Sequence, residues 1–187
     1  VDSSGMANGS FAVDLLSANT GVATFQQLQC VSNRSGPQVG GGGLRFEEPT
    51  STIDAGGGPA LLCQATSFGT SGASLLSVSS SGGAVGVSLT DTLGALTVSG
   101  TSGGAEDGSG GTIREISGTG ILLRNCHDIT LQSLRIGASG ELRNITSRGL
   151  DATNVDNLFV LGCAFINVGD EVETDAAIFG TNPVGLW

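Results

Sequence analysis

The chain has 187 residues, of which 39% are hydrophobic and 13% are charged, and its 32 glycines separate many short apolar runs. This composition is typical of a folded all-β domain with tight turns and excludes a disordered linker. Arginine supplies all seven positive charges and the net charge is −10, so we expect no nucleic-acid partner and no binding to anionic membranes. No apolar run approaches about 18 residues, so we expect no membrane insertion.

The N-terminal region carries the weakest pattern. Within residues 1–21, the stretch FAVDLLSA predicts either a first strand or a short helix that caps the domain. The next stretch, FQQLQCVS, has an apolar spacing close to that of a stretch near the other end of the chain. We therefore match three residues, Phe25, Leu28 and Cys30, with Val160, Cys163 and Phe165.

A loose repeat occupies the rest of the chain. GILLRNCHDITLQSLRIG at 120–137 returns 29 positions later as GLDATNVDNLFVLGCAFINVG, and weaker copies precede and follow the pair. One apolar position recurs 26, 34, 29 and 28 residues apart, at Leu61, Val87, Ile121, Leu150 and Ile178. A repeat of this length predicts a solenoid, in which stacked units supply one another's core.

Each copy contains three short stretches with period-two alternation, separated by Gly, Asn, Asp and Ser. This pattern predicts an all-β parallel β-helix with three short strands per coil of about 26–34 residues. We expect one domain over 1–187, with coils over 22–180 and a C-terminal end at 181–187. A polar residue recurs at one corner, where stacked side chains can bond along the axis: Asp91, Asn125 and Asn154.

The recurring apolar positions predict which side chains point into the core. This set comprises Leu61, Cys63, Val87, Leu89, Ile121, Leu123, Leu131, Leu134, Ile136, Val160, Cys163 and Phe165. The four cysteines, at 30, 63, 126 and 163, have spacings that match no zinc or haem motif. Buried free thiols are the favoured interpretation, and two disulfides are the alternative.

Four motifs carry a resemblance to a known class of protein: SGGAVGVSL, LTVSGTSGG, GSGGTI and GTGILLRNCHDITLQSL. With them, residues 22–180 resemble right-handed parallel β-helix segments of large bacterial adhesin-like surface proteins. The resemblance implies an extracellular or cell-surface location and a role that is usually not enzymatic. It is a resemblance of architecture, and it implies no particular ligand.

Parallel β-helices also include polysaccharide lyases and hydrolases, so we consider an enzyme as the alternative. NLFVLGCAFINVGDE is similar to a pectate-lyase pattern, but Leu161-Gly162 stands where that pattern has its Asp-His pair. The single histidine, His127, adjoins Cys126 and Asp128. Neighbouring residues in a strand point to opposite faces, so we expect neither pair to act as a catalytic dyad.

The densest acidic group follows the FINVG strand and consists of Asp170, Glu171, Glu173 and Asp175. With Asp151 or Asp156 it could supply the oxygen ligands that calcium prefers. The alternative is a solvated acidic loop that keeps the solenoid soluble. We expect no cofactor other than calcium.

The sequence therefore favours a non-catalytic structural or adhesive β-helix, secreted or displayed on a bacterial surface. We expect it to stack head to tail into a filament or against the rest of a longer solenoid, with surface glycans as a further partner. The alternative is a carbohydrate-active enzyme or a carbohydrate-binding relative of one. A groove that combines several carboxylates with an arginine would favour the enzyme. The arginines nearest the acidic turn are Arg124, Arg135, Arg143 and Arg148.

Overall fold

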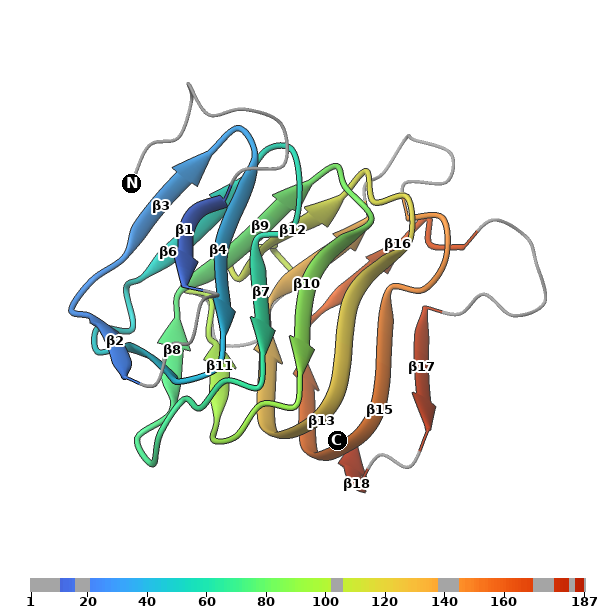
Figure 1. Ribbon diagram of the computed structural model, residues 1–187. Coiled ribbons are helices and arrows are strands. Elements are labelled where there is room, and N and C mark those ends of the chain that lie inside the picture. The colour runs from blue at the N-terminus through green and yellow to red at the C-terminus, as the bar shows by residue number, and fades with distance from the viewer. Residues whose placement is uncertain are drawn as a thin grey trace.

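The computed structural model describes residues 11–15, 21–101, 106–137, 145–169, 177–181 and 184–186. Every regular element in these ranges is a β-strand, and all the strand pairs are parallel. The strands form about six turns of a solenoid. Figure 1 shows the turns stacked along one axis, from β1 (Phe11–Leu15) at one end to β17 (Ile178–Thr181) at the other. The prediction of an all-β parallel solenoid is confirmed.

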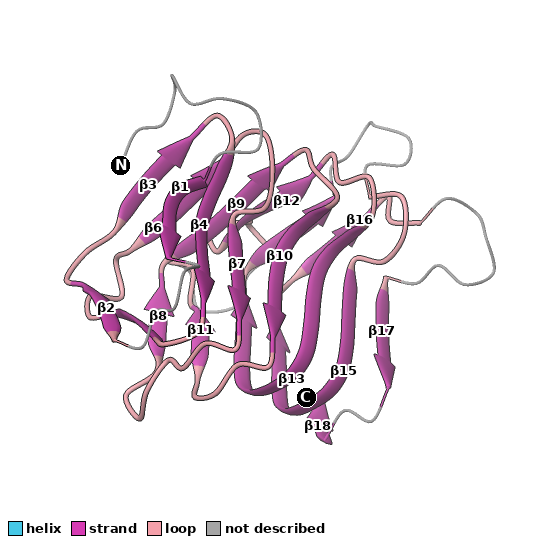
Figure 2. Ribbon diagram, viewed as in Figure 1, coloured by secondary structure: helices cyan, strands magenta, loops and turns pink. Residues whose placement is uncertain are grey.

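Each coil contributes to three faces. The first face contains β1, β4 (Ser35–Gly40), β7 (Leu61–Gln64), β10 (Val85–Thr90), the first parts of β13 (Thr119–Gln132) and β15 (Leu150–Leu161), and β17. The second contains β2 (Val22–Phe25), β5 (Gly43–Phe46), β8 (Ala73–Leu75), β11 (Leu96–Val98), the second parts of β13 and β15, and β18 (Val184–Leu186). The third contains β3 (Gln29–Ser32), β6 (Thr52–Ala55), β9 (Ser77–Ser81), β12 (Gly111–Arg114), β14 (Leu134–Gly137) and β16 (Ala164–Ile166). The strands β13 and β15 bend from the first face to the second (Figure 2).

The predicted register of the first face is confirmed. Leu61 lies opposite Val87, Val87 opposite Ile121, Ile121 opposite Leu150, and Leu150 opposite Ile178. Although the coils differ in length, this pairing keeps these side chains on the inner face, where each coil covers the next. The two coils before Leu61 are shorter, because Leu15 pairs with Val39 and Val39 pairs with Cys63.

The core runs along the axis as one cluster. Of the twelve predicted inward positions, nine are buried, and the other three, Val160, Cys163 and Phe165, are half-buried and pack against the same cluster. These three lie in the second part of β15 and after it, near the end of the solenoid. There, fewer coils remain to cover them.

The predicted match of Cys30 with Phe165 is wrong by two residues. The pairing on the third face runs Ser32, Ala55, Ser80, Ile113, Ile136, Phe165. Cys30 therefore falls in line with Cys163. A slip of two residues keeps the same side chains on the inner face, so a match of apolar letters does not detect it.

The predicted polar stack at the corner between the first and second faces is confirmed. Asp91, Asn125 and Asn154 all have positive φ, near +50°, a conformation that Asn and Asp tolerate better than most residues. Asn125 Nδ2 donates to Asp91 Oδ1 at 2.6 Å, and Asn154 Nδ2 donates to Asn125 Oδ1 at 3.1 Å. A second stack lies three residues further on, where Asn157 Nδ2 donates to Asp128 Oδ1 at 2.8 Å.

Candidate functional site

The acidic group considered for calcium lies outside the described residues: Asp170, Glu171, Glu173 and Asp175 all fall in the range 170–176. Within the described ranges, no three His, Cys, Asp or Glu side chains come together as a metal site. Asp156 and Asp151, which we considered as further calcium ligands, instead pair with nitrogen-bearing side chains. The calcium site stays a prediction.

His127 and Cys126 lie on opposite sides of the chain at the corner of β13. Cys126 is fully buried, whereas the His127 side chain is 46% exposed. His127 Nδ1 lies 3.0 Å from Asp156 Oδ2, and Asp156 is its register partner one coil further on. The thiol therefore points inward and the imidazole outward, so Cys126 and His127 do not face each other as a nucleophile and its base.

All four cysteines are free thiols. Burial raises the pKa of each of them, and that of Cys63 to about 12, so the thiols stay protonated at neutral pH. Cys126 Sγ contacts the carbonyl oxygens of Leu89 and Arg124, at 3.4 and 3.2 Å. Thr66 makes the same pair of contacts two coils earlier, to Val39 and Gln64. The thiol at this corner therefore acts as a weak hydrogen-bond donor to the backbone.

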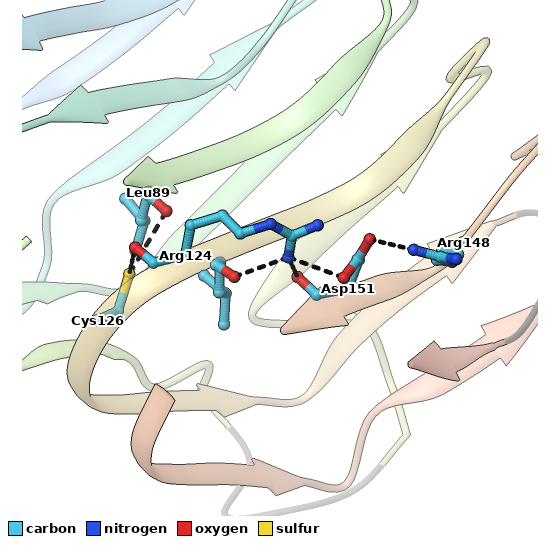
Figure 3. A network of polar contacts seen from close by, with 6 residues as sticks. Leu89, Arg124, Cys126, Arg148 and Asp151 are labelled. Carbon is cyan, nitrogen blue, oxygen red and sulfur yellow. Dashed lines mark hydrogen bonds and ion pairs between the residues drawn. The ribbon is translucent and has the colours of Figure 1, made fainter. Parts of the chain in front are cut away.

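Among the described residues, one buried charged cluster occurs, on the outer side of the first face and centred on Asp151 (Figure 3). Asp151 follows the inward Leu150 in β15, so alternation directs its side chain outward. Two arginines cover it. Arg124 Nη1 donates to Asp151 Oδ1 at 2.8 Å, and Arg148 Nη1 donates to Asp151 Oδ2 at 2.6 Å. Only 4% of the carboxylate side chain remains exposed.

The electrostatics of Asp151 follow from two opposing effects. Burial alone would raise the pKa of this carboxyl, but the hydrogen bonds and positive charges of Arg124 and Arg148 outweigh it and lower the pKa below its usual value. Arg124 Nη1 also donates to the carbonyl oxygens of Leu123 and Asp151, at 3.0 and 3.2 Å. The carboxylate is thus permanently ionised at neutral pH, and both of its oxygens accept charged hydrogen bonds.

The cluster connects three successive coils. Arg124 belongs to β13, Asp151 belongs to β15, and the Arg148 guanidinium carbon lies 3.8 Å from the ring centre of Phe179 in β17. Acid–base catalysis needs a carboxyl that can exchange its proton near neutral pH, and a lowered pKa opposes this. The arrangement can therefore join coils, and no described side chain adds to it the second carboxyl group that glycoside cleavage needs.

Replacing Asp151 by asparagine should lower the free energy of unfolding at pH 7 by about 1–3 kcal/mol, because two half-buried guanidinium groups lose their anionic partner. The loss should shrink as the pH falls below about 4. The unfolded chain protonates Asp151 near pH 3.8, whereas the folded chain holds the carboxylate down to lower pH, so the stabilisation disappears on acidification. Urea titrations of both proteins at pH 7 and in acid would measure this.

The exposed pair of Arg114 and Glu115 provides the control. Glu115→Gln should change the free energy of unfolding by less than about 0.5 kcal/mol at either pH. A loss from Asp151→Asn that is no larger than this, or that does not vary with pH, would contradict the assignment of Asp151 as a linking carboxylate.

The remaining predicted positions lie apart from this cluster or outside the described residues. Leu161, which stands where the lyase pattern has a charged residue, is 42% exposed. Arg135 lies on β14 with its Nε buried and without a hydrogen bond, and Arg143 lies outside the described residues. Arg124 and Arg148 were among the predicted site residues, whereas Asp151 was predicted as a calcium ligand. The signal for the true pairing was an aspartate in an apolar strand with an arginine three residues before it.

Comparisons of the chain with protein-family models, with curated proteins and with solved structures found no match. None of the described residues forms a helix long and apolar enough to cross a membrane.

Proposed function

We propose that this chain is a non-catalytic structural and adhesive β-helix of a secreted or cell-surface bacterial protein, which stacks end to end into a filament or a longer solenoid. The observation that carries the proposal is the open edge of β17. It pairs with β15 in the register used by every preceding coil, and within the described residues no strand pairs with its other edge.

The side chains of β17 support this reading. Ile178 occupies the same column as Leu61, Val87, Ile121 and Leu150, all of which are at most 4% exposed, yet Ile178 is 41% exposed. Its neighbour Phe179 is 36% exposed. A further coil in the same register would cover both residues and satisfy the open edge of the strand. An end that fits a different end grows a filament rather than a closed ring.

The absence of catalytic geometry among the described residues is the second support. The one buried carboxylate is held by two arginines, and the one histidine is exposed beside a single aspartate. The contacts of both groups run between coils, which makes the solenoid stiff. Stiffness suits a protein that acts as a spacer or as a display surface.

A charge placed in the open end should prevent stacking. Ile178→Asp puts a carboxylate on an already exposed position, so the fold should persist while association is lost. Leu93→Asp is the matched control, because Leu93 is 60% exposed but lies at a lateral corner. Light scattering and electron microscopy at neutral pH should show concentration-dependent association of the wild type and of Leu93→Asp, and monomers of Ile178→Asp. A wild type that stays monomeric at every concentration would overturn the stacking proposal.

A further inference from the structure

One loop interrupts the regular second face. Between β7 and β8 the chain runs through residues 65–72, while β2 and β5 form a separate two-stranded sheet. Three cavities, of about 160, 310 and 470 Å³, surround this loop, and each has residues between 67 and 74 in its wall. In repeat proteins, an insertion in one repeat commonly forms a binding face.

Arg45 of β5 lies between the two smaller cavities and contributes to the wall of both. Its Nε is buried and makes no hydrogen bond, and no described carboxylate forms an ion pair with the guanidinium. The guanidinium passes close to Gly69, where an added Cβ would come within 3.2 Å of Nη2. Glycine at this position, with φ of +70°, leaves room for the arginine.

An unpaired arginine is unusual in this acidic chain. Arg114, Arg124 and Arg148 each form an ion pair with a carboxylate. Arg135 shares the unbonded Nε of Arg45, but it lines none of the three cavities. A half-buried guanidinium with free donors beside a cavity is suited to an oxyanion, which can accept two parallel hydrogen bonds from it.

The walls of the 310 Å³ cavity indicate what the oxyanion is attached to. Beside Arg45 the lining residues include Ser71, Ser74 and Glu47, whose hydroxyl groups and carboxylate are of the kind that bonds to hydroxyl groups of a ligand. The volume is that of a small-molecule pocket. We propose that this cavity binds a small hydroxylated carboxylate, of the size of a sugar acid, with Arg45 holding the carboxylate group and the serines and Glu47 holding the hydroxyl groups.

This site rests on the adhesive part of the proposed function and gives it a ligand class. It lies on the second face and away from the open edge of β17, so stacking and binding can fail independently. Titrations should therefore be made with the wild type and repeated with Ile178→Asp, and both should bind equally.

Glucuronate is the probe, and glucose is its neutral match. Isothermal titration or heteronuclear NMR should show saturable binding of glucuronate and at least tenfold weaker binding of glucose, because glucose cannot bond to Arg45 as an anion. Methyl glucuronide distinguishes the sources of the acid. If methyl glucuronide binds as tightly as glucuronate, the ligand is a sugar acid within a glycan. If methyl glucuronide does not bind, the ligand is a free sugar acid.

Two pairs of variants test the geometry. Arg45→Gln should weaken glucuronate binding at least tenfold, whereas Arg135→Gln should leave it unchanged. Ser71→Trp should fill the cavity and abolish binding, whereas Thr70→Trp, on the adjacent residue that lines the 470 Å³ cavity, should not. All four variants should unfold at the wild-type temperature. Absence of saturable glucuronate binding, or equal affinity of the wild type and Arg45→Gln, would overturn the proposal.

Discussion

Replacing Leu123 by alanine should lower the free energy of unfolding by about 2–5 kcal/mol. Leu123 lies in a central coil, it is fully buried, and it pairs with Leu89 on one side and Ala152 on the other. The small side chain of Ala152 cannot move in to fill the space, so most of the cavity should persist. Urea unfolding followed by circular dichroism would measure the change.

The neighbouring residue provides the control. Leu122 points outward from the same strand and is half-buried. Leu122→Ala removes the same atoms from the surface, so its cost should be below about 1 kcal/mol. Equal costs at the two positions would mean that the strand does not present alternate residues to core and solvent, and they would contradict the fold.

The first face could be predicted from sequence because its apolar column has a physical cause that acts at every coil. A coil that shifts by one residue moves all its apolar side chains to the solvent side, so the register of five copies is preserved even where the letters differ. The same reasoning predicted the polar stack of Asp91, Asn125 and Asn154, which then proved to be hydrogen-bonded.

The third face was harder, because the corner before it varies in length. Five positions lead from Leu131 to Ile136, whereas fifteen lead from Val98 to Ile113, although Val98 pairs with Leu131 and Ile113 pairs with Ile136. Apolar spacing does not report the length of a corner. The match of Cys30 with Phe165 was wrong because a slip of two residues keeps the same side chains on the inner face, so the apolar pattern does not detect it.

The Asp151 cluster was only partly predictable. Alternation in β15 places the Asp151 side chain outward, so the strand considered alone predicts that this side chain is solvated. Its burial arises from Arg124 in the preceding coil and from Arg148, whose guanidinium also packs on Phe179. Such a cluster depends on how side chains of neighbouring coils point toward one another, and the spacing of residues within one strand does not predict this.

The corner between the first and second faces contains two stacked polar positions, of which only the first was predicted from sequence. In three successive coils positive φ occurs twice in this corner, three residues apart: at Asp91 and Gly94, at Asn125 and Asp128, and at Asn154 and Asn157. The residue after the first of each pair is buried: Thr92, Cys126 and Val155. In these three corners, two left-handed residues flank one inward and one outward residue and turn the strand, and Asn, Asp and Gly adopt this conformation at low cost. One coil earlier, the position equivalent to Asp91 is Ala65, which also has positive φ.

Gly111, at the start of β12, is a position where an added methyl group should be costly. Its φ is +113°, and an added Cβ would lie 2.0 Å from the carbonyl oxygen of Val78 in the adjacent strand. That oxygen belongs to the backbone of a neighbouring coil, so it cannot move away without breaking the register of the third face. Gly111 also donates its N–H to the carbonyl of Gly108 at 2.9 Å, which holds the turn before β12 in place.

Gly111→Ala should therefore lower the free energy of unfolding by about 3 kcal/mol or more, since backbone strain and overpacking act together. Gly108→Ala separates the two effects. Gly108 also has positive φ, +73°, but its nearest neighbour for an added Cβ is Arg135 Cβ at 3.6 Å, an ordinary contact. This variant should cost only about 1 kcal/mol, from the backbone conformation alone. Urea unfolding of both proteins decides the matter. If the two substitutions cost the same, the close approach of Gly111 to Val78 contributes nothing, and the tight stacking of the third face at this coil is refuted.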